Sequence, residues 1–150
     1  MVTLGEVDFT VDGEPLDFSE TWTYNGMAYS DVPNLVSSFG YINASWTLRV
    51  DLTCRFVCRL LNHMSATGAT ACTPRLRPGD LDMTPRPWID DFPAGYMQRS
   101  MAMLPKQGDR DPWINTQRYL DERRRFGRAK IDDGVMSFEL RGSPRASKSA

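Results

Sequence analysis

The chain has 150 residues, a formal net charge of −1 and a charged-residue content of 25%. Its length suits one domain with a hydrophobic core. Because the net charge is close to zero, the sequence excludes the strongly basic surface that nucleic-acid-binding proteins need. We therefore expect no nucleic-acid partner.

Hydropathy and cysteine usage bear on the cellular compartment. No apolar run approaches the ~20 residues that a membrane-spanning helix needs, so we expect no transmembrane segment. The opening residues, MVTLGEVDF, lack the basic and apolar regions of a signal peptide. Three cysteines, an odd number, do not indicate a disulfide framework. A cytoplasmic localisation is the resulting expectation.

The first 34 residues are expected to form a small antiparallel ribbon. Apolar and polar residues alternate from Val7 to Asp12, with the period of a half-buried strand. The dipeptides Asp12-Gly13 and Asn25-Gly26 each favour a tight hairpin turn. Pro33 then interrupts the chain before the next element.

Residues 35–67 are predicted to form a buried strand, a turn and a long amphipathic helix. The strand is expected over Leu35 to Phe39, and Gly40 permits a turn or a close backbone approach. Asn43 or Ser45 is expected to cap the helix, and a stop signal follows at 65–68. The expected apolar face consists of Leu52, Phe56, Val57, Leu60, Leu61 and Met64. The expected polar face consists of Arg49, Asp51, Arg55, Arg59 and Asn62, with Asp51 and Arg55 paired one turn apart.

A strand that ends in glycine and leads into a helix is a candidate binding site. The first amide N–H groups of a helix have no partners within it, and the helix dipole adds partial positive charge there. Such an end can accept a phosphate or another electron-rich group, at the carboxyl end of the strand. The competing interpretation is a purely structural strand–turn–helix unit, which is the commoner case.

The rest of the chain differs in composition and in hydrophobic periodicity. Prolines are frequent between 69 and 95 and periodicity is weak, which predicts an extended arm (Pro74, Pro78, Pro85, Pro87 and Pro93). A short helix is expected at about 96–104 and a second at about 114–126. We expect a first unit over 1–67, a C-terminal extension over 68–142 and a disordered tail over 143–150.

Several motifs resemble one enzyme family. The segment from Pro33 to Met64 contains GYINASWTL at 40–48, and later motifs are GYMQRS at 95–100, LPKQG at 104–108, PW at 112–113 and GRAKIDDG at 127–134. Together these resemble the C-terminal part of flavin-containing monooxygenases of the Baeyer–Villiger type, close to the branch that activates ethionamide. The resemblance covers most of residues 20–140. It implies an α/β fold in which residues 35–67 are the last strand–helix unit of a Rossmann-like FAD-binding domain, preceded by a β-hairpin and followed by a Pro-rich arm.

The resemblance also implies a function and a cofactor site. Family members bind FAD, use NADPH and dioxygen, and convert ketones to esters or oxidise sulfur-containing substrates. By this carry-over the flavin-contacting residues are Gly40, Tyr41, Asn43, Ala44, Ser45, Trp46 and Thr47. For Tyr41 and Trp46, packing in the core is the competing interpretation. The flavin performs the oxygen chemistry in this family, so we assign no catalytic residue.

The sequence departs from the family in ways that affect this prediction. No two glycines are two residues apart, so the G-x-G-x-x-G fingerprint for FAD is absent, as is the one for NADPH. We therefore expect a C-terminal fragment with an incomplete domain that alone binds neither cofactor and is inactive. A separately encoded N-terminal portion would then be its partner. The alternative is an inactive remnant or an interaction module, whose exposed apolar helix face recruits a partner or drives self-association.

A cysteine–histidine set is a second candidate site. Cys54, Cys58, His63 and Cys72 are all residue types that bind zinc. On a helix, however, His63 lies about 140° around from Cys58, so the ligands would not converge. Cysteines that pack in the core are the favoured interpretation, and no metal site is assigned.

Charged residues offer further candidates. A basic run extends from Arg118 to Lys130, but acidic residues within it favour a solvated helix face over a phosphate-binding surface. The neighbouring carboxylates Asp90-Asp91 and Asp132-Asp133 are expected to lie in solvated turns. Ser45 has no histidine at a predictable distance to activate it as a nucleophile.

Overall fold

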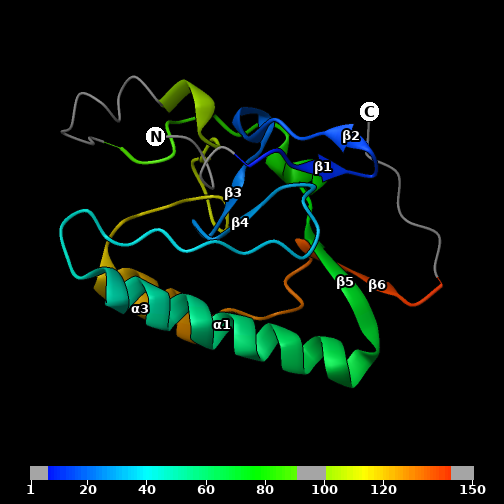
Figure 1. Ribbon diagram of the computed structural model, residues 1–150. Coiled ribbons are helices and arrows are strands. Elements are labelled where there is room, and N and C mark those ends of the chain that lie inside the picture. The colour runs from blue at the N-terminus through cyan, green and yellow to red at the C-terminus, as the bar shows by residue number, and fades with distance from the viewer. Residues whose placement is uncertain (1–6, 91–100, 143–150) are drawn as a thin grey trace.

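The computed structural model describes residues 7–90 and 101–142 and has a mixed α/β architecture (Figure 1). Its strands and helices are β1 (Thr10–Val11), β2 (Glu14–Pro15), β3 (Thr23–Tyr24), β4 (Ala28–Tyr29), α1 (Trp46–Thr67), β5 (Ala69–Pro74), α3 (Tyr119–Arg128) and β6 (Met136–Leu140). Within the described ranges the strands form three antiparallel pairs, β1–β2, β3–β4 and β5–β6. Helices α1 and α3 lie side by side, with β1–β4 on the other side of the molecule.

Both predicted hairpin turns are confirmed. Asp12 and Gly13 join β1 to β2 with φ of 56° and 87°; residues 25–27 join β3 to β4, with φ of 52° at Asn25 and 66° at Gly26. Positive φ at both central residues is what a tight hairpin turn requires. Each strand is only two residues long, so the ribbon is shorter than the alternating pattern predicts.

The predicted strand at Leu35 to Phe39 is wrong. This segment has no regular secondary structure and pairs with no strand among the residues that the structure describes, although the Ser37 amide donates a 2.8 Å hydrogen bond to the Met27 carbonyl. Its apolar side chains instead reach three different clusters: Leu35 the one around Tyr29, Val36 the main core, and Phe39 the one around Trp88. The apolar run therefore marks burial and not sheet pairing, a distinction that short runs do not make on their own.

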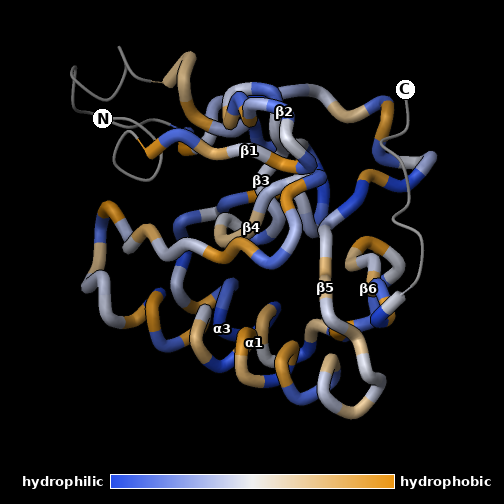
Figure 2. The backbone as a smooth tube through the Cα atoms, turned by 45° about the vertical axis from the view of Figure 1, so that its right-hand side comes forward, coloured by the Kyte–Doolittle hydropathy of each residue, from blue (hydrophilic) through white to orange (hydrophobic). Residues whose placement is uncertain are grey.

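Helix α1 matches its prediction closely at both ends. Ser45 is the N-cap residue, and Gly68, with φ of 73°, caps the C-terminus and donates its amide to the Met64 carbonyl. Figure 2 shows hydrophobic positions recurring along the helix. The predicted core residues Leu52, Phe56 and Leu60 are buried. Two assignments are wrong: Arg49, expected on the polar face, is buried, and Leu61, expected in the core, is exposed.

The segment after α1 also differs from its prediction. After Gly68, residues Ala69–Pro74 form β5, which pairs with β6; this strand was not predicted, because its partner is distant in the sequence. The second helix, α3, begins at Tyr119, five residues later than predicted. Of the predicted helix at 96–104, residues 96–100 lie outside the described residues, and Met101–Met103 form a single 3-10 turn. The predicted tail at 143–150 also lies outside them.

The main core forms where α1, α3 and the β5–β6 pair meet. Its buried residues include Tyr24, Leu52, Phe56, Cys72, Trp113, Phe126 and Met136. The cluster thus draws on both sides of the boundary predicted at 67–68, and the division into two units stays a prediction. No helix in the described ranges is both long enough and apolar enough to span a membrane.

Candidate functional site

The N-terminal end of α1 is exposed, as a binding role for this segment requires. Asn43, Ala44 and Ser45 precede the helix and are exposed, and so are Trp46 and Thr47 in its first turn. Gly40 and Tyr41, the other residues of the predicted site, are buried directly behind them. The structure therefore divides the predicted site into an exposed tip, residues 43–47, and a buried base.

The polarity of the tip favours an electron-rich ligand. The Ser45 side chain makes no capping hydrogen bond to the helix backbone, and its hydroxyl lies 2.8 Å from the Thr47 hydroxyl. No acidic residue occupies the first turn. The partial positive charge of the helix N-terminus is therefore not offset by a carboxylate of its own first turn.

Gly40 is required by the approach of Trp46. A Cβ atom on Gly40 would lie 2.2 Å from Cγ of the Trp46 ring. That ring packs against Phe39 with centroids 5.0 Å apart, and Phe39 packs against Trp88 at 4.8 Å. The expected close approach at Gly40 is thus an aromatic side chain of the same segment, which folds the tip back on itself.

Tyr41 belongs to the interior, one of the two roles expected for it. Its hydroxyl donates a 2.6 Å hydrogen bond to the Glu122 carboxylate of α3. Burial, followed by that carboxylate, raises the pKa of Tyr41 well above its usual range. The phenol therefore stays protonated and holds the base of the tip to α3.

A buried ion pair lies beneath the tip. Arg49 of α1 and Glu122 of α3 approach to 3.1 Å with side-chain exposures of 1% and 0%. Arg49 also donates to the Asn25 carbonyl and to Asn115 Oδ1, each at 2.9 Å, and Thr116 donates to Glu122 at 3.1 Å. Burial lowers the pKa of Arg49 and the charge of Glu122 opposes that shift. Each buried charge thus has an opposite charge and hydrogen bonds beside it, which offset the cost of removing it from water.

The Asn25-Gly26 turn packs directly against the Arg49 side chain of this ion pair. Gly26 has φ of 66°, and a Cβ atom there would lie 2.3 Å from Arg49 Nη2 and 2.7 Å from Asn115 Oδ1. Only glycine suits a position with both a left-handed backbone and so little space. The hairpin predicted from its turn motif therefore also positions α1.

The loop before α3 fixes the backbone that leads into the tip. Gln117 accepts a 3.0 Å hydrogen bond from the Ile42 amide and donates to Asn115 at 3.2 Å. Asn115 in turn donates to the Trp88 carbonyl at 3.0 Å. The tip is thus held by the hairpin, by α3 and by this loop.

Sequence reasoning missed the residues that hold the tip: Arg49, Asn115, Gln117 and Glu122. For Arg49, the helical spacing could have shown that it is buried. It lies three, seven and eleven residues before Leu52, Phe56 and Leu60, so it shares their face of the helix. No comparable pattern identifies Asn115, Gln117 or Glu122, because their partners are distant in the sequence.

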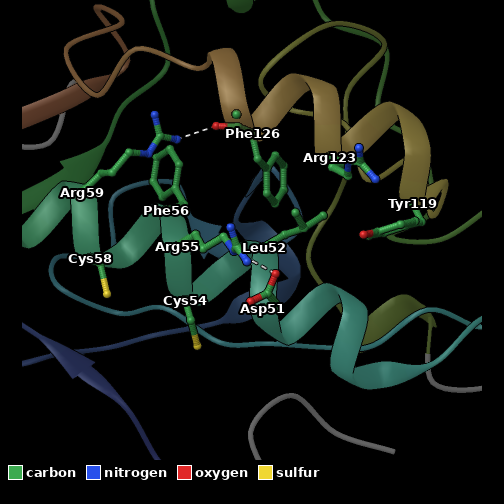
Figure 3. Close-up of a pocket in the computed structure, with 11 residues that line it drawn as sticks. Asp51, Leu52, Cys54, Arg55, Phe56, Cys58, Arg59, Tyr119, Arg123 and Phe126 are labelled. Carbon is green, nitrogen blue, oxygen red and sulfur yellow. Dashed lines mark hydrogen bonds and ion pairs between the residues drawn. The ribbon is translucent and has the colours of Figure 1, made fainter.

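A groove of about 830 Å³ runs between α1 and α3 (Figure 3). Leu52, Phe56 and Phe126 supply apolar surface, and Arg55 and Arg123 are among its charged residues. Arg59 closes the contact between the helices by donating to the carbonyl groups of Phe126 and Ala129. These bonds satisfy carbonyls at the C-terminal end of α3, which is a structural role.

The structure does not bring the cysteine–histidine set together. Packing of the cysteines in the core is confirmed for Cys72 on β5 and is wrong for Cys54 and Cys58, which are exposed on α1. His63 packs against Phe138, with ring centroids 4.7 Å apart. Over the residues that the structure covers, no group of three or more histidine, cysteine or acidic side chains could hold a metal ion.

Several of the charged candidates have partners within the fold, whereas Asp91 lies outside the described residues. In the basic run, Arg118 pairs with Asp121 at 3.0 Å and Arg125 with Asp111 at 2.7 Å. Asp90 pairs with Arg86. Asp133, expected in a solvated turn, instead accepts the Tyr24 hydroxyl at 2.9 Å and the amides of Val135 and Met136.

Comparison with known proteins identifies relatives. No family model and no solved structure matches the chain. The FAD-containing monooxygenase EthA of Mycobacterium tuberculosis is 44% identical over 140 residues, which are 93% of this chain and 28% of EthA. The probable FAD-binding monooxygenase AlmA of Acinetobacter baylyi is 41% identical over 137 residues, 91% of this chain and 27% of AlmA.

A third relative is the putative FAD-containing monooxygenase MymA of M. tuberculosis, 37% identical over 90% of this chain and 27% of MymA. The chain spans little more than a quarter of the length of these relatives. The family resemblance in the sequence is therefore confirmed: over almost its whole length, the chain is homologous to part of the FAD-containing monooxygenases.

Proposed function

We propose that this chain forms one wall of the cofactor site of an FAD- and NADPH-dependent monooxygenase of the Baeyer–Villiger type. The substrate would be a small ketone, which is converted to an ester, or a sulfur-containing compound. One observation carries the proposal: the exposed, uncapped N-terminus of α1 at residues 43–47, in a chain homologous to FAD-containing monooxygenases.

The tip fits the electron-rich edge of a flavin. Its helix dipole is not offset by a first-turn carboxylate, and residues 43–47 are exposed. The amides at the start of α1 would donate to the flavin, and Trp46, packed over Gly40, would flank it. When bound, FAD supplies the redox chemistry that activates dioxygen, while these residues bind and orient it.

Binding of the cofactor phosphates requires residues that this sequence lacks. Without G-x-G-x-x-G, it has no fingerprint of the kind that binds a pyrophosphate at a helix N-terminus. We expect the chain alone to bind FAD and NADPH weakly or not at all and to be inactive. Cofactor binding would then need a polypeptide that carries those fingerprints.

The experiment combines this chain with the part of M. tuberculosis EthA that lies outside the matched region. Retention of FAD through gel filtration and ketone-dependent NADPH oxidation are the measurements. In the mixture, Thr47→Glu should weaken FAD binding several-fold, because the new carboxylate offsets the helix dipole and repels the flavin. Thr47→Gln is the matched control, since it has the same size without the charge.

Thr47 is exposed, so both variants should keep the circular dichroism spectrum of the unmodified chain. Equal FAD retention by the Glu and Gln variants would contradict the assignment of the tip to the flavin. The second candidate function is a non-enzymatic interaction module, which the exposed apolar residues of α1 favour. It predicts that the mixture forms a complex but neither retains FAD nor oxidises NADPH.

A further inference from the structure

A smaller pocket lies beside the C-terminal end of α3. It has a volume of about 340 Å³, and its lining comes from the β3–β4 turn, from the last turn of α3 and from residues 77, 111–112 and 129–133. None of the residues 43–47 lines it. The lining of this pocket is therefore separate from the tip that we assign to the flavin.

Positive charge dominates the lining of the pocket. Its basic side chains are Arg77, Arg125, Arg128 and Lys130, and its acidic side chains are Asp111 and Asp133. The lining thus has a formal charge of +2, whereas the whole chain has a formal charge of −1. Arg77 is distant in the sequence from the other three basic residues, so the fold gathers these charges at one place.

Both acidic residues of the pocket are engaged within the fold. Asp111 accepts a 2.7 Å hydrogen bond from Arg125. Asp133 accepts hydrogen bonds from the Tyr24 hydroxyl and from two backbone amides, each at 2.9 Å. These donors reduce the repulsion that the two carboxylates would exert on an anion in the pocket.

The basic residues, in contrast, keep unused donors. Arg128 and Lys130 are exposed, and their side chains form no hydrogen bond or ion pair with another described residue. The Nε and Nη2 atoms of Arg125 are buried and have no hydrogen-bond acceptor in the described part of the chain, although Nη2 lies 3.9 Å from Glu122 Oε1. A buried charged donor without an acceptor costs free energy, and an anion in the pocket would reduce that cost.

Stabilisation of α3 explains only part of this cluster. Arg125 and Arg128 lie in the last turn of the helix, where positive charge interacts favourably with the helix dipole. Arg59 already donates to two carbonyl groups at this end. Arg77 and Lys130 lie outside the helix, so its dipole does not account for their place in the pocket.

We propose that this pocket binds the phosphate group of a small phosphate monoester. A phosphate dianion matches the charge of the lining, and its three terminal oxygens can accept from several guanidinium and ammonium groups at once. The volume leaves space for a small organic part beside the phosphate. The sequence favoured a solvated face for the basic run because it did not show that Arg77 lies beside that run.

The test is a titration of the isotope-labelled chain, followed by two-dimensional NMR of its backbone amides and arginine Nε–H groups. Phenyl phosphate should shift the signals of the Lys130 amide and the Arg125 Nε–H group in a saturable way. Acetate should bind at least tenfold more weakly, because it carries a single charge and two oxygens. The absence of saturable shifts with phenyl phosphate would overturn the proposal, as would equally tight binding of acetate.

A second probe distinguishes two sources of the phosphate group. Adenosine 2′-phosphate carries the phosphate by which NADPH differs from NADH. Affinity equal to that of phenyl phosphate would indicate a site for free phosphate esters, whereas at least tenfold tighter binding would indicate the cofactor. Both results retain the phosphate site.

Two substitutions that each remove one positive charge supply a matched control. Lys130→Gln should weaken the binding of phenyl phosphate at least fivefold, because it removes an unpaired cation of the pocket. Arg124→Gln removes an exposed cation of α3 that does not line the pocket and should have little effect. Both side chains are exposed, so both variants should keep the circular dichroism spectrum of the unmodified chain. Equal weakening by the two substitutions would contradict binding in this pocket.

The phosphate site and the proposed flavin contact can fail separately. Thr47→Glu, which tests the flavin contact, changes no residue of the pocket and should leave the affinity for phenyl phosphate unchanged. Loss of phenyl phosphate binding in Thr47→Glu would contradict the separation of the two sites and overturn the proposal for this pocket.

Discussion

The buried face of α1 is polar near the N-terminus of the helix and apolar farther along. These two regions hold the helix in place by different kinds of contact. Near the tip, Arg49 is fixed by directional bonds to Glu122, Asn115 and Asn25. Farther along, Phe56 and Leu60 pack in the apolar core. Directional bonds define a position more narrowly than apolar contacts do. The fold therefore holds the N-terminal end of α1 by polar contacts and the following turns by apolar packing.

Removing one charge of the buried pair should have the largest effect on stability. Glu122→Ala leaves the Arg49 guanidinium buried without its counter-ion and takes away the acceptor of Tyr41. We expect a loss of about 3–5 kcal/mol in the free energy of unfolding, measured with urea. Asp121→Asn, on the exposed side of the same helix turn, is the control and should cost less than ~1 kcal/mol. Similar losses in the two variants would mean that the buried pair does not anchor α1.

A methyl group on Gly26 should be the next most damaging change. Gly26→Ala combines a positive φ with a Cβ that meets Arg49 Nη2 at 2.3 Å, so either the turn or the ion pair must shift. We expect a loss of about 2–3 kcal/mol by urea unfolding. Gly13→Ala isolates the backbone contribution, because Gly13 has φ of 87° with nothing within 4 Å of its Cβ position. It should cost about 1 kcal/mol. Equal losses at the two glycines would remove the argument that Gly26 positions Arg49.

The Arg77–Asp80 pair should have a smaller, pH-dependent effect. Asp80 is buried, whereas Arg77 is half-exposed. Hydrogen bonds from Arg77 lower the pKa of Asp80 from 3.8 to about 2. Because the folded-state pKa is the lower one, the stabilisation is present above pH ~4 and is lost as the pH falls toward 2, by about 1–2 kcal/mol. Urea unfolding at pH values between 2 and 5 should therefore show a shallower pH dependence for Asp80→Asn than for the unmodified chain. An identical slope would contradict the assignment to Asp80.

The sequence predicted correctly those elements that are determined by residues close together in the chain. The hairpin turns at Asp12-Gly13 and Asn25-Gly26 and both ends of α1 follow from residues next to one another in the sequence. The β5–β6 pair and the Arg49–Glu122 contact join distant residues, and no periodic pattern reports such partners. The sequence predicted the exposed tip as a site but not the residues that hold it in place. The charge of Arg49 indicated the polar face of the helix, whereas its spacing from Leu52 and Phe56 indicates the buried face.

The smallest effect is expected at an exposed ion pair of α1. Asp51 and Arg55 form an ion pair of 2.9 Å on the exposed side of α1, next in the helix to the buried Arg49. Water screens this pair and both side chains are flexible, so Asp51→Asn should change the free energy of unfolding by no more than ~0.5 kcal/mol. The effect should also vanish in high salt, whereas the loss in Glu122→Ala should persist because that pair is shielded from solvent. Urea unfolding at low and high sodium chloride concentrations measures both. A large, salt-independent loss of stability in Asp51→Asn would contradict this prediction. It would mean that solvent exposure does not decide how much the ion pairs of Arg55 and Arg49 contribute to stability.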